Sequence, residues 1–486
     1  MKSHILLIIA LCILESSKNV ICGKIPDGTD SVHGEWSQWT NWNKCSAPCG
    51  NGVEGRVRNC SSPPQANGGK DCVGKSLEER PCNNGPCAEP AFMVSLKSTM
   101  NVYPGVMNWT SVDLNVNEMF DPKTNRVSIK KPGLYFFSMI TTSPAKKSID
   151  VMLENTGKNV GLYRRGDLRS EGAETLSRSG LFVLSQLYKP VMKQMTSSML
   201  YSSENGRETS WLGFHYVSDE YLFCGSHRNL QYGTVQWPFV SAMKGFQENS
   251  VLSQFKASKS GLYFLNAGMR LGYTTANTQY KAGISINVDR NYNVFQTPLE
   301  LKGAITSRGL SDTFSRSVLT RLTAGDVLRA EAHRPFSTIS PILSGRRIES
   351  YMAAFRLNEN LPYFQAVSTD STCREFRRIN LKSAIYDSQR SWNSKLHEYN
   401  IKKQGIYYIE FTLSKYRTSK VDVRMFLNKQ MVAVSAKQSM IDENKHFTRS
   451  TLLNLKVNDK IHWENYGCVD SDASVTIICT SAVSQN

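Results

Sequence analysis

One short pattern occurs three times in this chain and restricts its fold more than any other feature. A glycine is followed each time by four apolar, mostly β-prone residues: Gly133-Leu134-Tyr135-Phe136-Phe137, Gly261-Leu262-Tyr263-Phe264-Leu265 and Gly405-Ile406-Tyr407-Tyr408-Ile409. A glycine followed by such a run predicts a buried strand that begins at a tight turn. Repetition at this scale indicates three copies of one domain.

Further shared patterns lie downstream of each glycine. A triplet introduces a Leu-rich stretch each time: Ser177-Arg178-Ser179, Ser315-Arg316-Ser317 and Thr448-Arg449-Ser450. Each copy closes on a hydrophobic strand: Trp211–Val217, Tyr351–Leu357 and Val475–Cys479. Helical periodicity is weak, and short strands are separated by Gly, Asn, Ser and Lys. Copies of about 130 residues with this pattern predict antiparallel sandwiches or jelly rolls, so the expected fold class is all-β.

The N-terminus has the features of a targeting segment. Met1–His4 is short and basic, and Ile5–Leu14 is an apolar run of ten residues. This pattern predicts a secretory signal peptide over residues 1–23, followed by a linker over residues 24–33. The alternatives are a buried N-terminal helix and a membrane anchor, but ten apolar residues are too few to cross a bilayer. We therefore expect a secreted, extracellular protein with no membrane insertion, in an oxidising compartment.

The charge balance indicates acidic partners. Lys and Arg total 58 against 41 Asp and Glu, which gives a formal net charge of +17. Such a charge favours glycosaminoglycans, anionic cell surfaces or nucleic acid as partners, and secretion argues against nucleic acid. Residues 1–88 carry +1, and residues 89–218, 219–358 and 359–486 carry +4, +7 and +5. The basic character therefore belongs to the three long repeats.

A cysteine-rich module precedes the repeats. Six cysteines lie between residues 45 and 87, and tryptophan recurs every three residues at Trp36, Trp39 and Trp42. About fifty residues cannot bury enough surface to fold unaided, so a disulfide scaffold is expected. Spacing alone cannot choose among its connectivities. Zinc is the competing use of clustered cysteines, but paired C-x2-C motifs are missing, so no metal is expected.

Residues 34–88 resemble a thrombospondin type-1 repeat. The resemblance is carried by the Trp triplet, Cys45-x3-Cys49-Gly50, Arg56-x-Arg58-x-Cys60, Asn67-Gly68-Gly69, Arg80-x-Cys82 and Cys82-x4-Cys87. It implies a three-stranded module with the disulfides Cys45–Cys82, Cys49–Cys87 and Cys60–Cys72. It also implies a cation–π ladder, in which the indole rings of Trp36, Trp39 and Trp42 interleave with Arg56, Arg58 and Arg80.

Several modification sites follow from the same segment and its neighbour. Pro48 stands where type-1 repeats often carry an O-fucosylated Ser or Thr, so that modification should be absent. The W-x-x-W spacing allows C-mannosylation of Trp36 and Trp39, although both rings can serve as ladder rungs without it. Two N-glycosylation sequons occur, at Asn59 and Asn108. The first contains Cys60 and is less reliably used.

The first long repeat, residues 89–218, resembles a C1q globular-head domain of the tumour-necrosis-factor-like jelly-roll fold. The matching residues are Ala91-Phe92-x-Val94, Phe120-Asp121, Thr124-Asn125, Pro132-Gly133-x-Tyr135-x-Phe137 and Gly213-Phe214. The second repeat, residues 219–358, keeps Gly261-x-Tyr263-Phe264 and Leu322-x-x-Gly325-Asp326. The third, residues 359–486, is more diverged and is assigned mainly through internal repetition.

The resemblance also implies an assembly, because jelly rolls of this family usually pack as trimers about a threefold axis. Here three copies share one chain, and their connections leave only three or four residues between strands. An extended linker of that length spans roughly 10–16 Å. It can join neighbouring chain ends of a trimer but cannot separate the domains. We therefore predict an intramolecular pseudo-trimer.

Four cysteines lie outside the small module: Cys224, Cys373, Cys468 and Cys479. Three pairings are possible. Cys468 and Cys479 flank an expected terminal hairpin, which favours the pair Cys468–Cys479, and Cys224–Cys373 follows by elimination. Buried free thiols are the alternative.

No catalytic residue, cofactor site or metal site can be nominated. H-E-x-x-H, G-x-S-x-G, P-loop and dinucleotide motifs are all missing from the sequence. The one peptide with a binding mechanism is Arg165-Gly166-Asp167, which stands in a polar stretch and could engage an integrin; chance occurrence is the alternative. The acidic pair Asp219-Glu220 is expected to be solvated.

The expected function is that of a secreted, non-catalytic adhesive or recognition protein of the extracellular matrix or a body fluid. Its expected partners are an anionic polysaccharide such as a glycosaminoglycan, a cell-surface receptor, or both. The alternative is a soluble C1q- or tumour-necrosis-factor-like ligand that clusters receptors.

Overall fold

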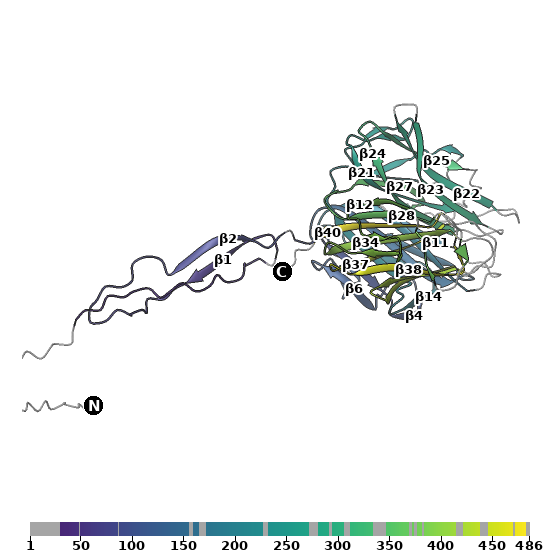
Figure 1. Ribbon diagram of the computed structural model, residues 1–486. Coiled ribbons are helices and arrows are strands. Elements are labelled where there is room, and N and C mark those ends of the chain that lie inside the picture. Colours follow the sequence, from purple (N-terminus) through teal and green to yellow (C-terminus); the bar gives the residue numbers. More distant parts are fainter. Residues whose placement is uncertain are drawn as a thin grey trace, which may run out of the picture. The chain divides into compact units, whose positions relative to one another are not determined.

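The described part of the chain forms two compact units built from strands (Figure 1). The computed structural model describes residues 30–47, 49–85, 87–154, 159–164, 172–226, 232–271, 280–290, 294–305, 312–333, 347–368, 372–373, 377–381, 383–414, 421–437, 446–469 and 472–482. These residues contain no helix, so the all-β prediction is confirmed, and none of them forms a helix that could cross a membrane. The expected signal peptide lies outside the described residues.

The smaller unit ends at Gly85 and contains one regular antiparallel pair, β1 (Asn51–Val57) and β2 (Leu77–Asn83). The tryptophan segment runs along β1 as the third strand of the module, although its backbone pairing is irregular. Its hydrogen bonds to β1 and the residues beyond are Ser37 N to Asn59 O, Thr40 N to Val57 O, and Asn43 N to Gly55 O. The segment advances three residues for every two of its partner, so a side chain at every third position faces the same side.

The larger unit contains three repeats, and each has an inner five-stranded sheet of the same strand order. In repeat 1 the order is β12 (Ala173–Leu184), β9 (Gly133–Pro144), β15 (Ser210–Tyr216), β3 (Ala91–Ser95) and β6 (Ser111–Val116). In repeat 2 it is β24 (Asp312–Leu322), β21 (Gly261–Leu271), β27 (Ser350–Arg356), β16 (Tyr221–Ser226) and β18 (Phe239–Lys244). In repeat 3 it is β37 (His446–Leu455), β34 (Gly405–Ser414), β40 (Ser474–Ala482), β28 (Tyr363–Val367) and β31 (Ser383–Asp387).

An outer sheet covers each inner sheet and completes a sandwich. Repeat 1 uses β11 (Asn159–Arg164), β10 (Ile149–Glu154), β13 (Val191–Gln194) and β5 (Gly105–Val106). Repeat 2 uses β23 (Val294–Ile305), β22 (Tyr280–Arg290), β25 (Val327–His333), β20 (Gln254–Lys256) and β19 (Gln247–Asn249), with β17 (Gly233–Thr234) beside β25. Repeat 3 uses β36 (Gln430–Lys437), β35 (Val421–Leu427), β38 (Lys460–Tyr466), β33 (Glu398–Asn400) and β32 (Trp392–Asn393), with β30 (Arg377–Arg378) beside β38.

Short strand pairs complete the unit. They are β4 (Ser98–Val102) with β14 (Ser198–Ser203), β7 (Phe120–Asp121) with β8 (Arg126–Val127), and β29 (Thr372–Cys373) with β39 (Cys468–Val469). Strand β26 (Arg347–Ile348) of repeat 2 pairs in parallel with β11 of repeat 1. A strand pairing therefore connects repeats 1 and 2 directly.

The strand that follows each repeated glycine is apolar on both faces, and the two faces pack against different cores. In β21, Tyr263 and Leu265 lie inside the sandwich of repeat 2, whereas Leu262 and Phe264 belong to a core that all three repeats share. In β34, Tyr407 and Ile409 face inward, and Ile406 and Tyr408 join the shared core. Successive side chains on a strand point to opposite faces, so one strand serves both cores.

The shared core forms around a pseudo-threefold axis. Phe136, Phe264 and Tyr408, each three residues after its repeat's glycine, meet there. Their ring centroids are 5.6 Å apart for Phe136–Phe264, 5.3 Å for Phe136–Tyr408 and 6.0 Å for Phe264–Tyr408. Strands β12, β24 and β37 also lie against one another, and Figure 1 shows strands of all three repeats side by side. The predicted intramolecular pseudo-trimer is confirmed.

Candidate functional site

The smaller unit carries an uninterrupted ladder of indole and guanidinium groups. Each arginine stacks on tryptophan at these carbon-to-centroid distances: Arg58 4.5 Å from both Trp36 and Trp39, Arg56 5.0 Å from Trp39 and 4.8 Å from Trp42, and Arg80 4.1 Å from Trp42. The three-against-two stagger of the backbone explains this order. Arg56 on β1 and Arg58 just beyond its end are two residues apart, and they alternate with tryptophans that are three residues apart; Arg80 on β2 completes the ladder.

The ladder arginines are also engaged by other partners. Arg56 pairs with Glu78 and Arg80 with Glu54, both at 2.6 Å, and these residues stand opposite each other on β1 and β2. Arg58 Nε donates to Lys75 O at 3.0 Å. The charges of this surface are therefore largely neutralised within the module, and it offers little free cation to an anionic ligand.

Arg58→Ala should lower the free energy of unfolding of the smaller unit by about 1–2 kcal/mol, since it removes two cation–π contacts at a partly exposed site. Denaturation of the full chain, followed by tryptophan near-UV circular dichroism, would measure the loss. Lys44→Ala is the matched control, because Lys44 is a cation of the same segment outside the ladder. Equal midpoints for the two variants would contradict a stabilising role for the ladder.

Disulfides hold this unit together. Cys45 is bonded to Cys82 and Cys60 to Cys72. Cys49 and Cys87 are disulfide-bonded as well. All six cysteines that the sequence assigned to this scaffold are therefore oxidised.

The two pairs expected outside the module are wrong. Cys224 on β16 and Cys479 on β40 are both free and buried, so neither Cys224–Cys373 nor Cys468–Cys479 forms. Cys479 stands on the inner sheet opposite Tyr407. The backbone register instead places Cys373 on β29 directly opposite Cys468 on β39.

We expect Cys373 and Cys468 to form a disulfide under oxidising conditions, because residues paired directly across antiparallel strands lie within the range of Cα separations that disulfides span. Non-reducing peptide mapping should recover these two cysteines in one linked peptide. Cys224 and Cys479 should react with an alkylating reagent only after unfolding, since burial raises the pKa of the Cys479 thiol to about 12. A recovered Cys224–Cys373 peptide would contradict this assignment.

Three buried arginines connect the repeats. Arg178, Arg316 and Arg449 are the middle residues of the three repeated triplets and are at most 9% exposed. Each donates to the chain at the start of another repeat's closing strand: Arg178 Nη2 to Ile348 O (2.9 Å) and Glu349 O (2.7 Å), Arg316 Nη2 to Asp472 O (3.2 Å), and Arg449 Nη1 to Ser210 Oγ (2.9 Å). The contacts run from repeat 1 to 2, from 2 to 3 and from 3 to 1.

A polar layer lies on the axis two residues beyond the aromatic trio. Its members are Ser138, Asn266 and Glu410, which occupy the same position in the three repeats. The Glu410 carboxylate accepts hydrogen bonds from Ser317 N at 2.7 Å and Ser317 Oγ at 2.9 Å, and from the Tyr408 hydroxyl. Burial raises the pKa of Glu410. Ser138 Oγ lies 2.8 Å from Ser450 Oγ, so hydrogen bonds across this layer also join different repeats.

His446 is buried between repeats 2 and 3 and is held by hydrogen bonds to both. His446 is 1% exposed, its Nδ1 accepts from Lys302 N at 3.0 Å, and its Nε2 lies 2.6 Å from the Asp472 carboxylate. This arrangement requires the neutral tautomer with the proton on Nε2. Arg316 Nη1 lies 3.4 Å from Nε2. Burial, together with the positive charges of Arg316 and Lys302, lowers the pKa of His446, although Asp472 opposes the shift.

The junction of repeats 2 and 3 should therefore weaken in acid. Because the folded-state pKa of His446 lies below its ordinary value of 6.5, the unfolded chain takes up the proton first as the pH falls. Neutral His446 contributes its full stabilisation at pH values above the unfolded-state pKa of 6.5, and this stabilisation is lost as the pH falls to the folded-state pKa. His446→Asn, which keeps an acceptor near the Nδ1 position, should lose less stability between about pH 7.5 and about pH 5.5 than the parent. Parallel denaturation curves over this range would contradict the assignment.

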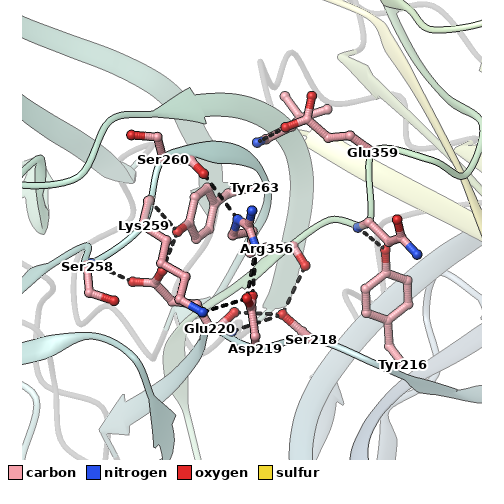
Figure 2. Close-up of polar contacts among 12 residues, drawn as sticks. Tyr216, Ser218, Asp219, Glu220, Ser258, Lys259, Ser260, Tyr263, Arg356 and Glu359 are labelled. Atoms are coloured by element: carbon pink, nitrogen blue, oxygen red, sulfur yellow. Dashed lines mark hydrogen bonds and ion pairs between the residues drawn. The ribbon is translucent and has the colours of Figure 1, made fainter.

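The two linkers between repeats line an open pocket of about 350 Å³. Figure 2 shows the polar contacts of the linker residues. Asp219 in the first linker accepts from Arg356 Nη1 at 2.9 Å through both oxygens and from Lys259 Nζ at 2.7 Å. In the second linker, Asn358 N donates to the Tyr216 hydroxyl at 3.0 Å, which ties this linker to repeat 1. Although partial burial opposes it, the hydrogen bonds from Lys259 and Arg356 lower the pKa of Asp219.

The acidic residues of these linkers are structural. Glu220, expected to be solvated, is fully buried; its carboxylate accepts from Ser258 N at 2.7 Å and lies 2.6 Å from the Tyr263 hydroxyl. Glu359 pairs with Arg321 at 3.0 Å and accepts from Leu262 N. The carboxylates around the pocket therefore fix the path of the chain between repeats, and no arrangement of nucleophile and base lies among them.

Comparisons with known proteins agree with both units. The thrombospondin type 1 domain family matches residues 37–87, and the C1q domain family matches residues 91–214 and 363–476. The chain therefore contains a thrombospondin type 1 domain and C1q domains. Repeat 2 lies outside the matched ranges but has the same strand order as the other two. Repeat 3, the diverged copy by sequence, is one of the two that the family matches.

Several curated proteins are similar to this chain over short segments. The chain is 50% identical to semaphorin-5B of Mus musculus over 66 residues, 45% identical to SCO-spondin of Gallus gallus over 58, and 54% identical to hemicentin-1 of Homo sapiens over 56. These alignments cover 12–13% of this chain and only 1–6% of those proteins. Among solved structures, the globular domain of zebrafish complement 1qA protein matches with 13% identity and a TM-score of 0.22, over 24% of this chain and 96% of that one.

The remaining candidate sites of the C1q repeats and the type 1 domain are only partly described. Arg165-Gly166-Asp167 lies outside the described residues, as does Pro48. Asn59 and Asn108 are both exposed, which is compatible with glycosylation. The buried arginines of the C1q repeats were missed as contacts between domains, although their recurrence in each triplet was the available signal.

Proposed function

We propose that this protein is a secreted, non-catalytic adhesive or recognition protein that binds an anionic polysaccharide of the extracellular matrix or cell surface. One observation carries the proposal: three C1q-type repeats share a single core, and together they hold nearly all of the chain's excess positive charge. Their segments contribute +16 of the formal +17. A rigid body with this charge suits a multivalent anionic ligand.

The type 1 domain has a different place in this proposal. Its segment contributes only +1, and its ladder arginines are engaged by indole rings and carboxylates. The type 1 domain should therefore attract polyanions only weakly, and the C1q repeats should retain most of the affinity for a polyanion when this domain is removed.

The second candidate function is a soluble ligand that clusters receptors, and the trimer-like packing favours it. A ligand of that kind needs three similar surfaces to gather three copies of one receptor. The repeats differ at equivalent exposed positions: Lys131 of repeat 1 pairs with Glu89, whereas Lys403 of repeat 3 donates to Asn360 O. Unequal surfaces favour recognition of one partner over the clustering of three, so adhesion is preferred.

Heparin chromatography tests the proposal. The full chain should elute well above physiological salt, and a chain lacking residues 34–88 should elute at nearly the same salt concentration, because each engaged cation adds to the salt dependence. Cells treated with heparan-degrading enzymes should bind less protein than untreated cells. Elution at physiological salt together with unchanged cell binding would remove the polysaccharide as a partner.

Cell attachment through Arg165-Gly166-Asp167 is a separate part of the proposal, supported only by the sequence. Asp167→Glu keeps the charge and lengthens the side chain by one methylene, which should misplace the carboxylate relative to an integrin-bound metal. Integrin-bearing cells should attach less to this variant when divalent cations are present. Equal attachment, or attachment that survives chelation, would show that the motif is not used.

A further inference from the structure

Four turns of the third C1q repeat meet at one end of its outer sheet. They are residues 387–390, 401–403, 428–429 and 456–460. Direct hydrogen bonds join them: Lys402 Nζ to Arg390 O at 2.7 Å, Ile401 N to Asp459 O at 2.8 Å, Asn458 N to Ile401 O at 2.8 Å, and Asn428 N to Lys460 O at 2.9 Å. The four turns therefore form one continuous surface, called here the repeat-3 basic surface.

Six exposed cations project from this surface: Arg390, Lys402, Lys403, Lys429, Lys456 and Lys460. Lys402 and Lys403 donate to backbone carbonyls, which position these ammonium groups without neutralising them. Among the described ion pairs, the six cations have one carboxylate contact, Lys460 to Glu398 at 4.0 Å, and Glu398 is already paired with Arg378 at 3.1 Å.

The acidic groups on the same turns are turned toward the backbone. Asp459 accepts from Lys456 N at 2.8 Å and from Asn428 Nδ2 at 2.7 Å. Asp387 accepts from the N–H groups of Ser391 and Trp392, both at 2.9 Å. Two carboxylates against six cations leave the surface strongly positive, because Glu398 and Arg378 cancel each other.

The equivalent lysines of the other repeats are neutralised. Lys131 of repeat 1 pairs with Glu89 at 2.9 Å, and Lys259 of repeat 2 pairs with Asp219 at 2.7 Å. In repeat 3 the position of Glu89, three residues before the first buried phenylalanine, is Leu361. Lys403 therefore lacks, among the described ion pairs, the carboxylate partner that Lys131 and Lys259 have.

We propose that the repeat-3 basic surface is the site that binds a sulfated polysaccharide, and this inference rests on the proposed function, which it localises. The cations come from four separate turns, so a compact monovalent anion can reach only one or two of them. An extended chain with regularly spaced sulfates can engage several at once and displace their counterions, which makes its binding strong and dependent on salt.

The test compares two quadruple variants of the full chain. The first carries Lys403→Gln, Lys429→Gln, Lys456→Gln and Lys460→Gln. The matched control carries Lys97→Gln, Lys123→Gln, Lys244→Gln and Lys256→Gln, which removes four exposed lysines from the other two repeats. Both lose four charges, so a difference between them reports position and not net charge. Binding to immobilised heparin is measured at several salt concentrations.

The first variant should bind heparin about tenfold or more weakly and show a shallower dependence on salt, whereas the control should stay close to the parent. Replacing the same four repeat-3 lysines by arginine should preserve binding, and unchanged thermal unfolding shows that the fold is intact. Equal losses in both quadruple variants overturn the site but leave the proposed function standing. A parent that does not bind heparin refutes both. Stronger binding to phosphatidylserine vesicles than to heparin would assign the surface to a membrane and overturn the proposal.

Discussion

Phe136→Ala should lower the free energy of unfolding of the three-repeat unit by about 3–5 kcal/mol. The ring is fully buried on the pseudo-threefold axis, in edge contact with Phe264 and Tyr408. Its removal leaves a cavity whose walls belong to three distant parts of the chain, so no single repeat can collapse to fill it. Urea denaturation followed by fluorescence measures the loss.

Two further variants make this prediction specific. Tyr103→Ala removes a ring that is 70% exposed and should change stability by less than about 0.5 kcal/mol. Phe137→Ala empties the sandwich of repeat 1 instead, because Phe137 packs on Phe182 and Trp211. Hydrogen exchange of β21 and β34 should quicken in Phe136→Ala more than in Phe137→Ala. Equal exchange in the two variants would mean that the shared core does not couple the repeats.

Arg449→Ala should lower the free energy of unfolding by about 3–5 kcal/mol. The substitution opens a cavity and leaves the Arg207 carbonyl and the Ser210 hydroxyl without their donor. Burial lowers the pKa of Arg449 to about 10, so the guanidinium is still charged at neutral pH. Arg449→Lys keeps the charge but cannot reach both acceptors with one ammonium group, so most of the loss should remain.

A hydrophobic replacement separates volume from charge at this position. Arg449→Met fills the space without burying a charge and should be clearly less damaging than Arg449→Ala. Thermal unfolding of the three variants beside the parent orders them. If Arg449→Ala stays within about 1 kcal/mol of the parent, the buried arginine is not what joins repeat 3 to repeat 1.

The strands at the centre of each repeat could be predicted because their signal is local. A glycine before four apolar residues indicates a turn and a buried strand, and the structure supplies the reason for the glycine. A Cβ on Gly133 would lie 2.3 Å from Nε2 of His215, and one on Gly261 would lie 2.7 Å from Nε of Arg356. The pseudo-trimer was predicted from two premises together: the trimers that the family resemblance implies, and linkers too short to separate the domains.

The contacts between repeats could not be predicted from local pattern. An arginine in a polar triplet is ordinarily exposed, and nothing near Arg178 in the sequence shows that Glu349 O will lie 2.7 Å away. Glu220 reads as a solvated linker residue, yet the linker turns inward and buries it. The cysteine pairing failed for the same reason. The expected pair Cys468–Cys479 rests on two cysteines that are close in sequence and flank a hairpin. The cross-strand register instead places Cys468 opposite Cys373.

Glu410 shows what joining the repeats in one chain permits. In an assembly of three identical subunits, any substitution on the axis is made three times, and a glutamate there would bring three carboxylates together in a dry interior, where they could not all ionise. In this chain the two equivalent positions are Ser138 and Asn266, so a single carboxylate occupies the axis. Because the three copies share one chain, each position of the central layer can carry a different side chain, which three identical subunits cannot do.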